Sequence, residues 1–213
     1  MLNFPEGFFD RADETPDADF YCVPRLVAHV DEVTIDALRG FYADTLIPIA
    51  GSEGLSLLDL MSSWISHLPE SLALRDATGL GMNEAELAEN PRLHQTIVRD
   101  LNEQPQLPFP DARFDVVLNA FSIQYLTQPI DVFRDIARVL APGGLSIVAM
   151  SHRCFPTKAI RAFHHLDGEG RCNLVAAYHH ATNAFDDIQC LDGSPSRGDP
   201  LWLVVAKKSA ATS

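Results

Sequence analysis

Near the N-terminus, apolar residues recur at steps of three and four, which is the spacing of a helix that buries one face. This spacing predicts helical structure over 26–30 and again over 34–46, with Thr34 as the N-cap of the second segment. Pro48 and the glycines of 51–54 then end the predicted helical region.

From residue 55 onward, short apolar runs alternate with helical segments. Strands are predicted at 55–61, 77–81, 94–101, 114–121 and 145–150. Asn83 and Glu86 form a capping-box pattern that predicts a helix over 83–90. A second helix is expected within 127–144, with Pro129 in its first turn and Pro142-Gly143-Gly144 stopping it. Apolar strands separated by helices are typical of a parallel, doubly wound sheet.

The C-terminal part of the chain has a different pattern. Two strand candidates, 185–192 and 201–208, are joined by the Gly/Pro/Ser-rich segment 193–200 with no helix between them. A connection this short cannot make a parallel crossover, so the two strands should pair antiparallel. The predicted fold class is α/β, with a doubly wound, mostly parallel seven-stranded sheet, an antiparallel C-terminal hairpin strand and an N-terminal helical cap.

The predicted organisation is one globular unit with short additions at both ends. Residues 1–50 form an irregular acidic arm and the helical cap, 51–208 form the α/β domain, and 209–213 are a tail. The 213 residues are 46% apolar and 21% charged, as in an ordinary globular protein. The formal net charge of −13 argues against nucleic acid and anionic membranes as partners.

The chain shows no targeting or metal-binding pattern. It has no apolar run of about 18 residues, as a membrane span needs, and its acidic N-terminus is unlike a signal peptide, so a cytoplasmic protein is expected. The four cysteines are scattered, which indicates reduced thiols and no zinc site. The histidine pairs 164–165 and 179–180 are expected to be exposed, because adjacent histidines on a helix diverge by about 100°.

The segment LPFPDARFDVVLNAFSIQYLTQPIDVFRDIARVLAPGGLSIVAMS, residues 107–151, resembles the class I S-adenosylmethionine-dependent methyltransferases, in particular the broad type 11 group. The resemblance extends over about 55–208, and it implies methyl transfer from S-adenosylmethionine to a small-molecule acceptor, with S-adenosylhomocysteine as product. It also implies that the cofactor lies at the ends of the first four strands. By this resemblance the cofactor-binding residues are Asp59, Met61, Ser62, Ser63, Gly81, Met82, Asn83, Asp100, Leu101, Asn119 and Ala120.

Two elements depart from the pattern that the family shows. Met61, Ser62 and Ser63 stand where the family has a glycine-rich turn, and Gly81 stands where it has an acid for the ribose hydroxyls. Without glycine, the turn is expected to keep negative φ values. Asn83 or Glu84 could reach the ribose instead, although Asn83 is also the natural helix cap.

A helix is expected directly after the first strand, with Trp64 buried against it rather than stacked on adenine. Tyr21, Arg25 and Arg153 are candidates for contact with the acceptor, and His152 and Tyr125 are weak candidates for a catalytic role. Each of these residues has a structural alternative: a loop that caps a helix for 152–153, and packing for the tyrosines and Arg25.

Two other enzyme classes lack their motifs in this chain. No GxSxG elbow surrounds Ser62 and Ser63, as a nucleophilic hydrolase would need, and no GxGxxG follows the first strand, as a dehydrogenase would need. The sequence leaves two functions open: S-adenosylmethionine-dependent methyl transfer, and a noncatalytic binding or regulatory protein with a degenerate cofactor site. It does not indicate the acceptor or the oligomeric state.

Overall fold

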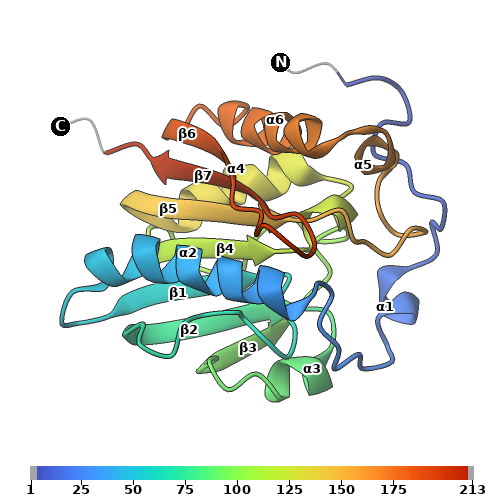
Figure 1. Cartoon of the computed structure of the whole chain (residues 1–213). Helices are drawn as coiled ribbons and strands as arrows, with labels where there is room; N and C mark the ends of the chain where they lie inside the picture. Colours follow the sequence, from blue (N-terminus) through green and yellow to red (C-terminus); the bar gives the residue numbers. More distant parts are fainter. Residues whose placement is uncertain (1–3, 211–213) are drawn as a thin grey trace.

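A seven-stranded sheet forms the centre of the computed structural model, which describes residues 4–210 (Figure 1). The strand order is β3-β2-β1-β4-β5-β7-β6. The strands are β1 (Leu55–Leu60), β2 (Leu74–Gly81), β3 (Gln95–Val98), β4 (Phe114–Ala120), β5 (Leu140–Met150), β6 (Phe185–Asp192) and β7 (Trp202–Lys208). The helices are α1 (Asp17–Phe20), α2 (Glu32–Ala50), α3 (Glu84–Ala88), α4 (Pro129–Val139), α5 (Arg161–His165) and α6 (Gly168–His180), with a short 3-10 helix at Ile123–Tyr125. Of the predicted tail, 211–213 lie outside the described residues.

Strand pairing confirms the predicted fold class. The strands β1 to β5 pair in parallel, and β7 runs antiparallel to both of its neighbours, β5 and β6. From β1 the chain proceeds to β2 and β3 on one side of the sheet, then returns to β4 and β5 on the other. The carboxyl ends of β1 and β4 are therefore the topological switch point, where open α/β sheets bind ligands.

One face of the sheet is covered by α2, and the opposite face by α4 and α6 (Figure 1). On α2, Leu38, Tyr42 and Leu46 are fully buried against Leu57 of β1 and Val116 of β4. Burying a side chain of this size stabilises the fold by roughly 1.5–3 kcal/mol. None of the described helices is both long and apolar enough to cross a membrane.

The N-terminal helices differ from the prediction. Residues 26–30 are not helical: Leu26 and Val27 are 51% and 56% exposed, and only Val30 packs into the apolar core. The helix α2 starts one turn before the predicted Thr34 cap, since the Asp31 carboxylate accepts a hydrogen bond from the Thr34 amide. The helix also includes Pro48 in its last turn.

The expected helix after β1 is absent, and that prediction is wrong. Residues 61–73 are irregular and lead directly from β1 to β2. The face that an intervening helix would cover is taken by α2, and Leu68 and Leu72 of the irregular segment pack into the same apolar cluster. The prediction of negative φ also fails, because Met61 has φ 57°.

Two further expectations need correction. The helix α4 ends at Val139, so Pro142-Gly143-Gly144 belongs to the start of β5 rather than to a helix stop. His179 is fully buried, not exposed, because its ring packs edge-on between Phe133 and Phe185. Burial lowers the pKa of His179 to about 4.

Candidate functional site

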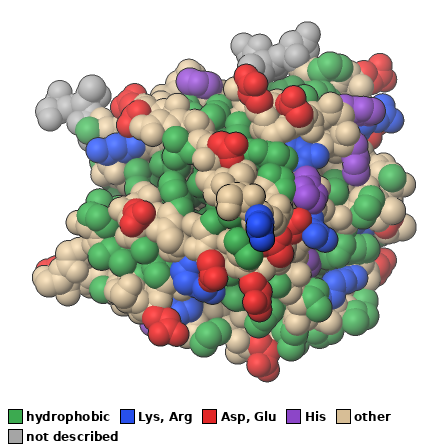
Figure 2. All heavy atoms as spheres, in the orientation of Figure 1, with side chains coloured by type: hydrophobic (Ala, Val, Ile, Leu, Met, Phe, Trp, Pro, Cys, Tyr) green, Lys and Arg blue, Asp and Glu red, His purple; other side chains and the backbone are tan. Residues whose placement is uncertain are grey.

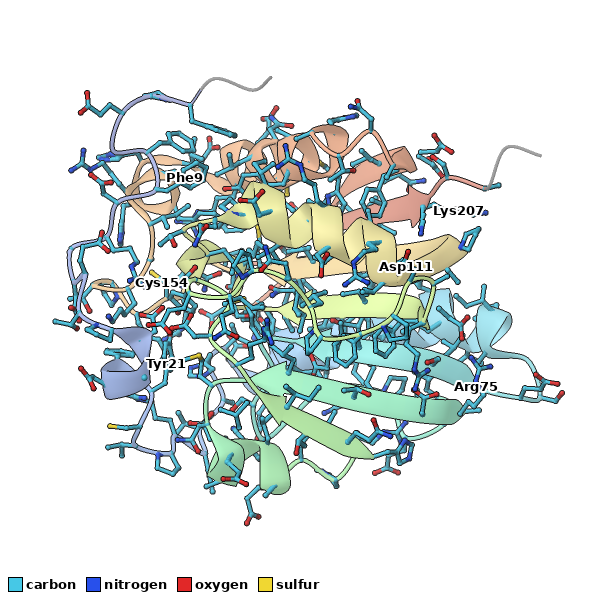
Figure 3. The ribbon with its side chains drawn as sticks, turned by 180° about the vertical axis from the view of Figure 1, so that it is seen from behind. Phe9, Tyr21, Arg75, Asp111, Cys154 and Lys207 are labelled. Atoms are coloured by element: carbon cyan, nitrogen blue, oxygen red, sulfur yellow. The ribbon has the colours of Figure 1, made fainter. Side chains whose placement is uncertain are left out.

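A cavity opens at the carboxyl ends of β1, β2 and β4, the switch point of the sheet. It contains about 1100 Å³ of space, part of it open to solvent. The predicted acceptor residue Tyr21 lies at this end of the molecule, and Arg75 and Asp111 lie at the opposite end (Figure 3). On the face that carries α2, acidic, basic and histidine side chains are interspersed and do not form one basic patch (Figure 2).

The N-terminal arm, residues 11–29, supplies one wall of the cavity. Tyr21 and Arg25 line it, and the arm is fastened to the opposite wall by two residues of the α3 region. Asn83 Nδ2 donates to Tyr21 O at 2.9 Å, while Asn83 Oδ1 caps α3. Glu86 Oε1 accepts a hydrogen bond from the Arg25 amide at 2.7 Å. Asn83 is thus a helix cap and an anchor for the arm at the same time.

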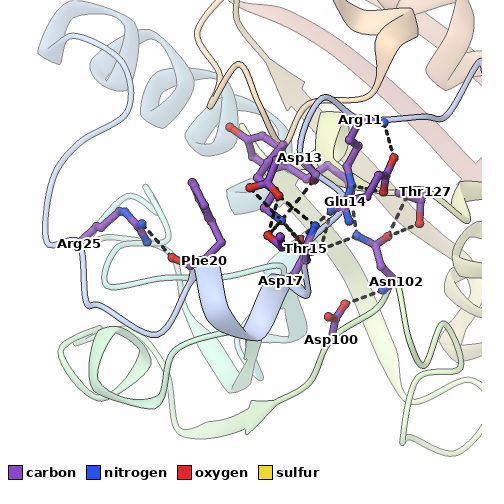
Figure 4. Close-up of polar contacts among 12 residues, drawn as sticks. Arg11, Asp13, Glu14, Thr15, Asp17, Phe20, Arg25, Asp100, Asn102 and Thr127 are labelled. Atoms are coloured by element: carbon purple, nitrogen blue, oxygen red, sulfur yellow. Dashed lines mark hydrogen bonds and ion pairs between the residues drawn. The ribbon is translucent and has the colours of Figure 1, made fainter.

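A buried ionic cluster fixes the beginning of the same arm (Figure 4). The Asp17 carboxylate accepts two hydrogen bonds from Arg11 Nη1, at 2.7 and 2.8 Å. Lys158 Nζ, on a side chain with no exposed surface, lies 3.2 Å from Asp17 Oδ1, and Asn102 Nδ2 donates to Asp17 Oδ2 at 2.8 Å. The arm is therefore held by charge pairs that are shielded from solvent.

Asp59, at the end of β1, forms part of the cavity floor. Its side chain is 4% exposed, and its Oδ2 accepts hydrogen bonds from Ser62 Oγ and Ser66 Oγ, both at 2.6 Å. Burial raises the pKa of Asp59 to about 6, against the opposing effect of the two hydroxyls. Asp59 thus holds the irregular segment after β1 in place.

Two non-glycine residues in the cavity wall have left-handed backbone conformations. Met61 follows β1 and Phe121 follows β4, and each has φ 57°. For a residue with a side chain, this conformation costs on the order of 1–2 kcal/mol. The turn that glycines would form is therefore made by a strained methionine.

The end of β2 has no room for a side chain at residue 81. The Ser62 amide donates to Leu80 O at 2.8 Å, which draws the Ser62 peptide across the strand. A Cβ on Gly81 would overlap the Ser62 carbonyl oxygen. A nearby carboxylate is that of Glu86, whose Oε2 accepts a hydrogen bond from Ser63 Oγ at 2.6 Å.

The end of β3 and the turn after β4 complete the lining. Asp100 and Leu101 both face the cavity, and Asp100 Oδ1 accepts a hydrogen bond from the Asn102 amide at 2.8 Å. Tyr125 also lines it, but its hydroxyl accepts a hydrogen bond from the Phe155 amide at 2.9 Å. Burial raises the pKa of Tyr125 to about 12, so the phenol stays protonated at neutral pH.

Three of the predicted site residues lie away from the cavity lining. Asn119 is 2% exposed, and its Nδ2 donates to Leu60 O at 3.3 Å. His152 Nε2 and Arg153 Nε lie 3.3 and 2.7 Å from the Asp199 carboxylate, in the loop before β7. All the other predicted residues line the cavity: Tyr21, Arg25, Asp59, Met61, Ser62, Ser63, Gly81, Met82, Asn83, Asp100, Leu101, Ala120 and Tyr125.

The sequence interpretation missed several lining residues. Trp64 was expected to be buried on a helix, but it is partly exposed in the cavity wall and its indole N–H donates to Val27 O at 3.2 Å. His67 and Asp17 also line the cavity and carry no motif. The sequence indicated Glu86 only as part of a capping box. Its place in the cavity wall has no sequence signal, because its carboxylate contacts Arg25, 61 residues away.

Comparison with known proteins finds a family match over the middle of the chain. Residues 65–148 match the family model described as "Methyltransferase domain", of the type 11 group. Over these residues the chain resembles the class I methyltransferases of type 11. The matched region begins after Trp64, so the segment without glycines lies outside it.

Individual proteins similar to this chain are distant or match over a short stretch. The ubiquinone/menaquinone biosynthesis C-methyltransferase UbiE of Azotobacter vinelandii is 46% identical over 43 residues, which span 20% of this chain and 17% of that protein. The structure of the [4+2]-cyclase SpnF is similar with a TM-score of 0.61 and 16% identity, over 83% of this chain and 82% of that one. An S-adenosylmethionine-dependent methyltransferase from Mesorhizobium loti gives a TM-score of 0.55 and 16% identity, over 82% of this chain and 100% of that one. The two structural likenesses show the fold alone.

Proposed function

We propose that this protein binds S-adenosylmethionine in the cavity at the switch point and transfers its methyl group to a small-molecule acceptor. The observation that carries the proposal is the composition of the cavity wall. All residues that the sequence predicts for the cofactor, except Asn119, line one cavity, although they come from four different strand ends. The methyltransferase-domain match supports the type of reaction.

The residues present fit the cofactor if ribose recognition moves to another residue. Asp100 and Leu101 would hold the adenine side, and Met61 with Ser122 would lie along the methionine side. Gly81 offers no carboxylate, but Glu86 does. Each of its two oxygens accepts one hydrogen bond, and an ionised carboxylate has about four acceptor positions. Glu86 therefore keeps capacity to accept from ribose hydroxyls.

When bound, S-adenosylmethionine would supply an activated methyl group on a sulfonium. The contribution of the protein would be to hold the acceptor in line with that group and to exclude water, because catalysis of this kind rests on proximity and orientation. The arm, fastened through Asn83, Glu86 and Asp17, gives the cavity the wall that such exclusion needs.

A noncatalytic binding protein is the second candidate function. It is favoured by the Ser62 peptide, which closes the end of β2 at Gly81, and by the arm, which already occupies one oxygen of Glu86. In that case the cavity would bind a ligand other than S-adenosylmethionine.

Calorimetric titration with S-adenosylmethionine and S-adenosylhomocysteine separates the two candidates. We expect dissociation constants in the micromolar range, and an Asp100→Ala variant that binds both ligands at least tenfold more weakly. His152→Ala, whose side chain lies outside the cavity, serves as the matched control and should bind like the wild type. Absence of heat and of any thermal shift at millimolar ligand would reject the methyltransferase function.

A further inference from the structure

His67 is a buried cavity residue in an unusual backbone conformation. It lies in the irregular segment between β1 and β2, lines the cavity and is 8% exposed. Its φ is 55°, a left-handed value that is uncommon among non-glycine residues. Its ring packs against that of Phe121, which follows β4.

Nδ1 of His67 is completely buried and has no hydrogen-bond partner within residues 4–210. The other buried histidine, His179, shows the usual arrangement. Its Nδ1 lies 3.0 Å from Val175 O and its Nε2 lies 2.9 Å from Ser146 Oγ. Buried polar groups in native proteins are almost always paired, so an unpaired imidazole in a cavity wall indicates a group that a ligand pairs with.

The imidazole of His67 is neutral at physiological pH. Burial, together with the positive charge of Arg39 on α2 and the nearby His29 of the arm, lowers its pKa to about 4. A neutral imidazole has one nitrogen that accepts a hydrogen bond and one that donates. His67 can therefore accept the hydrogen of a hydroxyl group.

Aromatic and apolar side chains surround this nitrogen acceptor. The ring of His67 lies edge-on to that of Phe121, with centroids 5.6 Å apart, and Trp64, Ile65 and Phe155 belong to the same wall. Asp59 is already paired with two serines and Tyr125 with the Phe155 amide, whereas Ser122 Oγ in the same lining has no hydrogen-bond partner within residues 4–210. The wall fits an apolar or aromatic body that carries a hydroxyl group.

We propose that His67 binds the hydroxyl group of the methyl acceptor and takes up its proton, and that the acceptor is a small neutral molecule with an aromatic or apolar body, such as a phenol or an aromatic alcohol. This inference rests on the proposed methyl transfer. A hydroxyl donates one hydrogen bond, which matches the single acceptor nitrogen of a neutral imidazole.

The reaction balances with His67 as the proton acceptor. The acceptor oxygen forms the new bond to the methyl carbon, and the sulfur–methyl bond breaks with its electron pair left on sulfur. Bond formation leaves a positive charge on the oxygen, so its proton becomes acidic enough to pass to the imidazole, which later releases it to water. No oxidant, reductant or further reactant is needed.

The first test measures binding at His67 directly. Protein labelled with ¹⁵N-histidine is titrated, with S-adenosylhomocysteine present, with phenol and benzyl alcohol, and in parallel with their methyl ethers, anisole and benzyl methyl ether. We expect the hydroxyl probes to shift the His67 ring-nitrogen signals and to bind at least tenfold more tightly than the ethers. Equal binding of alcohols and ethers, or hydroxyl probes that leave the His67 signals unmoved, would overturn the inference.

Variants assign the effect to the side chain. His67→Asn is preferred to alanine because asparagine tolerates positive φ, and circular dichroism checks that it folds. It should abolish the preference for hydroxyl probes and lower kcat for any methylated probe at least a hundredfold, while His152→Asn, whose histidine lies outside the cavity, leaves both unchanged. A His67→Asn variant that keeps the hydroxyl preference would also overturn the inference.

The result is separable from that of the proposed function. If hydroxyl probes shift His67 but S-adenosylmethionine gives no binding heat, the hydroxyl site stands and methyl transfer fails. If S-adenosylmethionine binds and the hydroxyl probes show no preference, the methyltransferase function stands and the role of His67 is rejected.

Discussion

The carbonyl oxygen of Ser62 lies directly against the α-carbon of Gly81, so the segment after β1 closes the end of β2. A methyl group at residue 81 would overlap backbone that the Ser62 amide holds in place through Leu80 O. We expect Gly81→Ala to lower the free energy of unfolding by about 1–3 kcal/mol, the usual cost of overpacking.

Gly40 provides the matched control. It lies on the exposed side of α2 with no atom within 4 Å of an added Cβ. Gly40→Ala should therefore raise the free energy of unfolding by roughly 0.5–1 kcal/mol, because alanine is the better helix former. Urea denaturation measures both variants, and a Gly81→Ala protein as stable as the wild type would contradict the contact.

Glu86→Gln tests whether the ribose acceptor has moved from residue 81 to α3. A hydrogen bond to a charged acceptor is worth about 1.5–3 kcal/mol, so loss of the charge should weaken S-adenosylhomocysteine binding roughly ten- to a hundredfold. Glu89→Gln, at an exposed carboxylate just after α3, is the control and should leave the affinity unchanged. Calorimetry that gives the same dissociation constant for Glu86→Gln and the wild type would reject this role.

The sheet could be predicted from the sequence because the patterns that indicate its strands lie within short segments of the chain. Each strand of the core carries an apolar run, and the short link 193–200 already dictates the reversed strand β7. The helix α4 was found for the same reason, since Pro129 marks its first turn and its apolar residues recur on one face.

The cavity wall could not be predicted in the same way, because it depends on contacts between distant segments. The arm residue Arg25 contacts Glu86, and α2 takes the place of the helix expected after β1. Neither arrangement leaves a periodic signal. The left-handed conformations of Met61 and His67 could not be predicted either, because neither residue is a glycine, the residue type that usually indicates a positive φ.

Met61 offers a test of strain in the turn after β1. Its φ of 57° is tolerated by glycine but is costly for a β-branched residue. Met61→Val should lower the free energy of unfolding by about 2 kcal/mol or more, whereas Met61→Gly should change it by less than about 1 kcal/mol, because relief of strain offsets the added chain entropy. Met82→Val, at a partly buried methionine without positive φ, is the control. Equal losses for the two Met61 variants, measured by urea denaturation, would show that strain is absent.

Asp59 should make stability depend on pH in an unusual direction. Its folded-state pKa of about 6 lies above the ordinary value of 3.8, so the folded protein binds the proton more tightly than the unfolded chain. The contribution of Asp59 is therefore fully present below about pH 4 and is lost as pH rises toward 6. With about 1.36 kcal/mol for each pH unit between the two pKa values, the loss is on the order of 2–3 kcal/mol.

The Asp59→Asn variant isolates this effect because asparagine does not ionise. Its amide oxygen can still accept from Ser62 and Ser66, so the segment after β1 stays anchored. We expect the variant to exceed the wild type in stability by about 2 kcal/mol at pH 7.5 and to approach it at pH 4. Asp36→Asn, at a side chain that is 71% exposed, should follow the wild type at both pH values. A constant difference between Asp59→Asn and the wild type across this range would contradict the raised pKa.

The cluster around Asp17 predicts unequal costs for its members. Asp17 is the shared partner of Arg11 and Lys158, and all three side chains are at least nine-tenths buried. Asp17→Asn leaves two buried cations without their common carboxylate and should lower the free energy of unfolding by about 3–5 kcal/mol. Lys158→Met should cost less, because Asp17 keeps its paired hydrogen bonds from Arg11. Both losses can be read from urea denaturation, and limited proteolysis should cut the arm of Asp17→Asn first. A larger loss for Lys158→Met than for Asp17→Asn would show that Lys158, rather than Asp17, is the centre of the anchor.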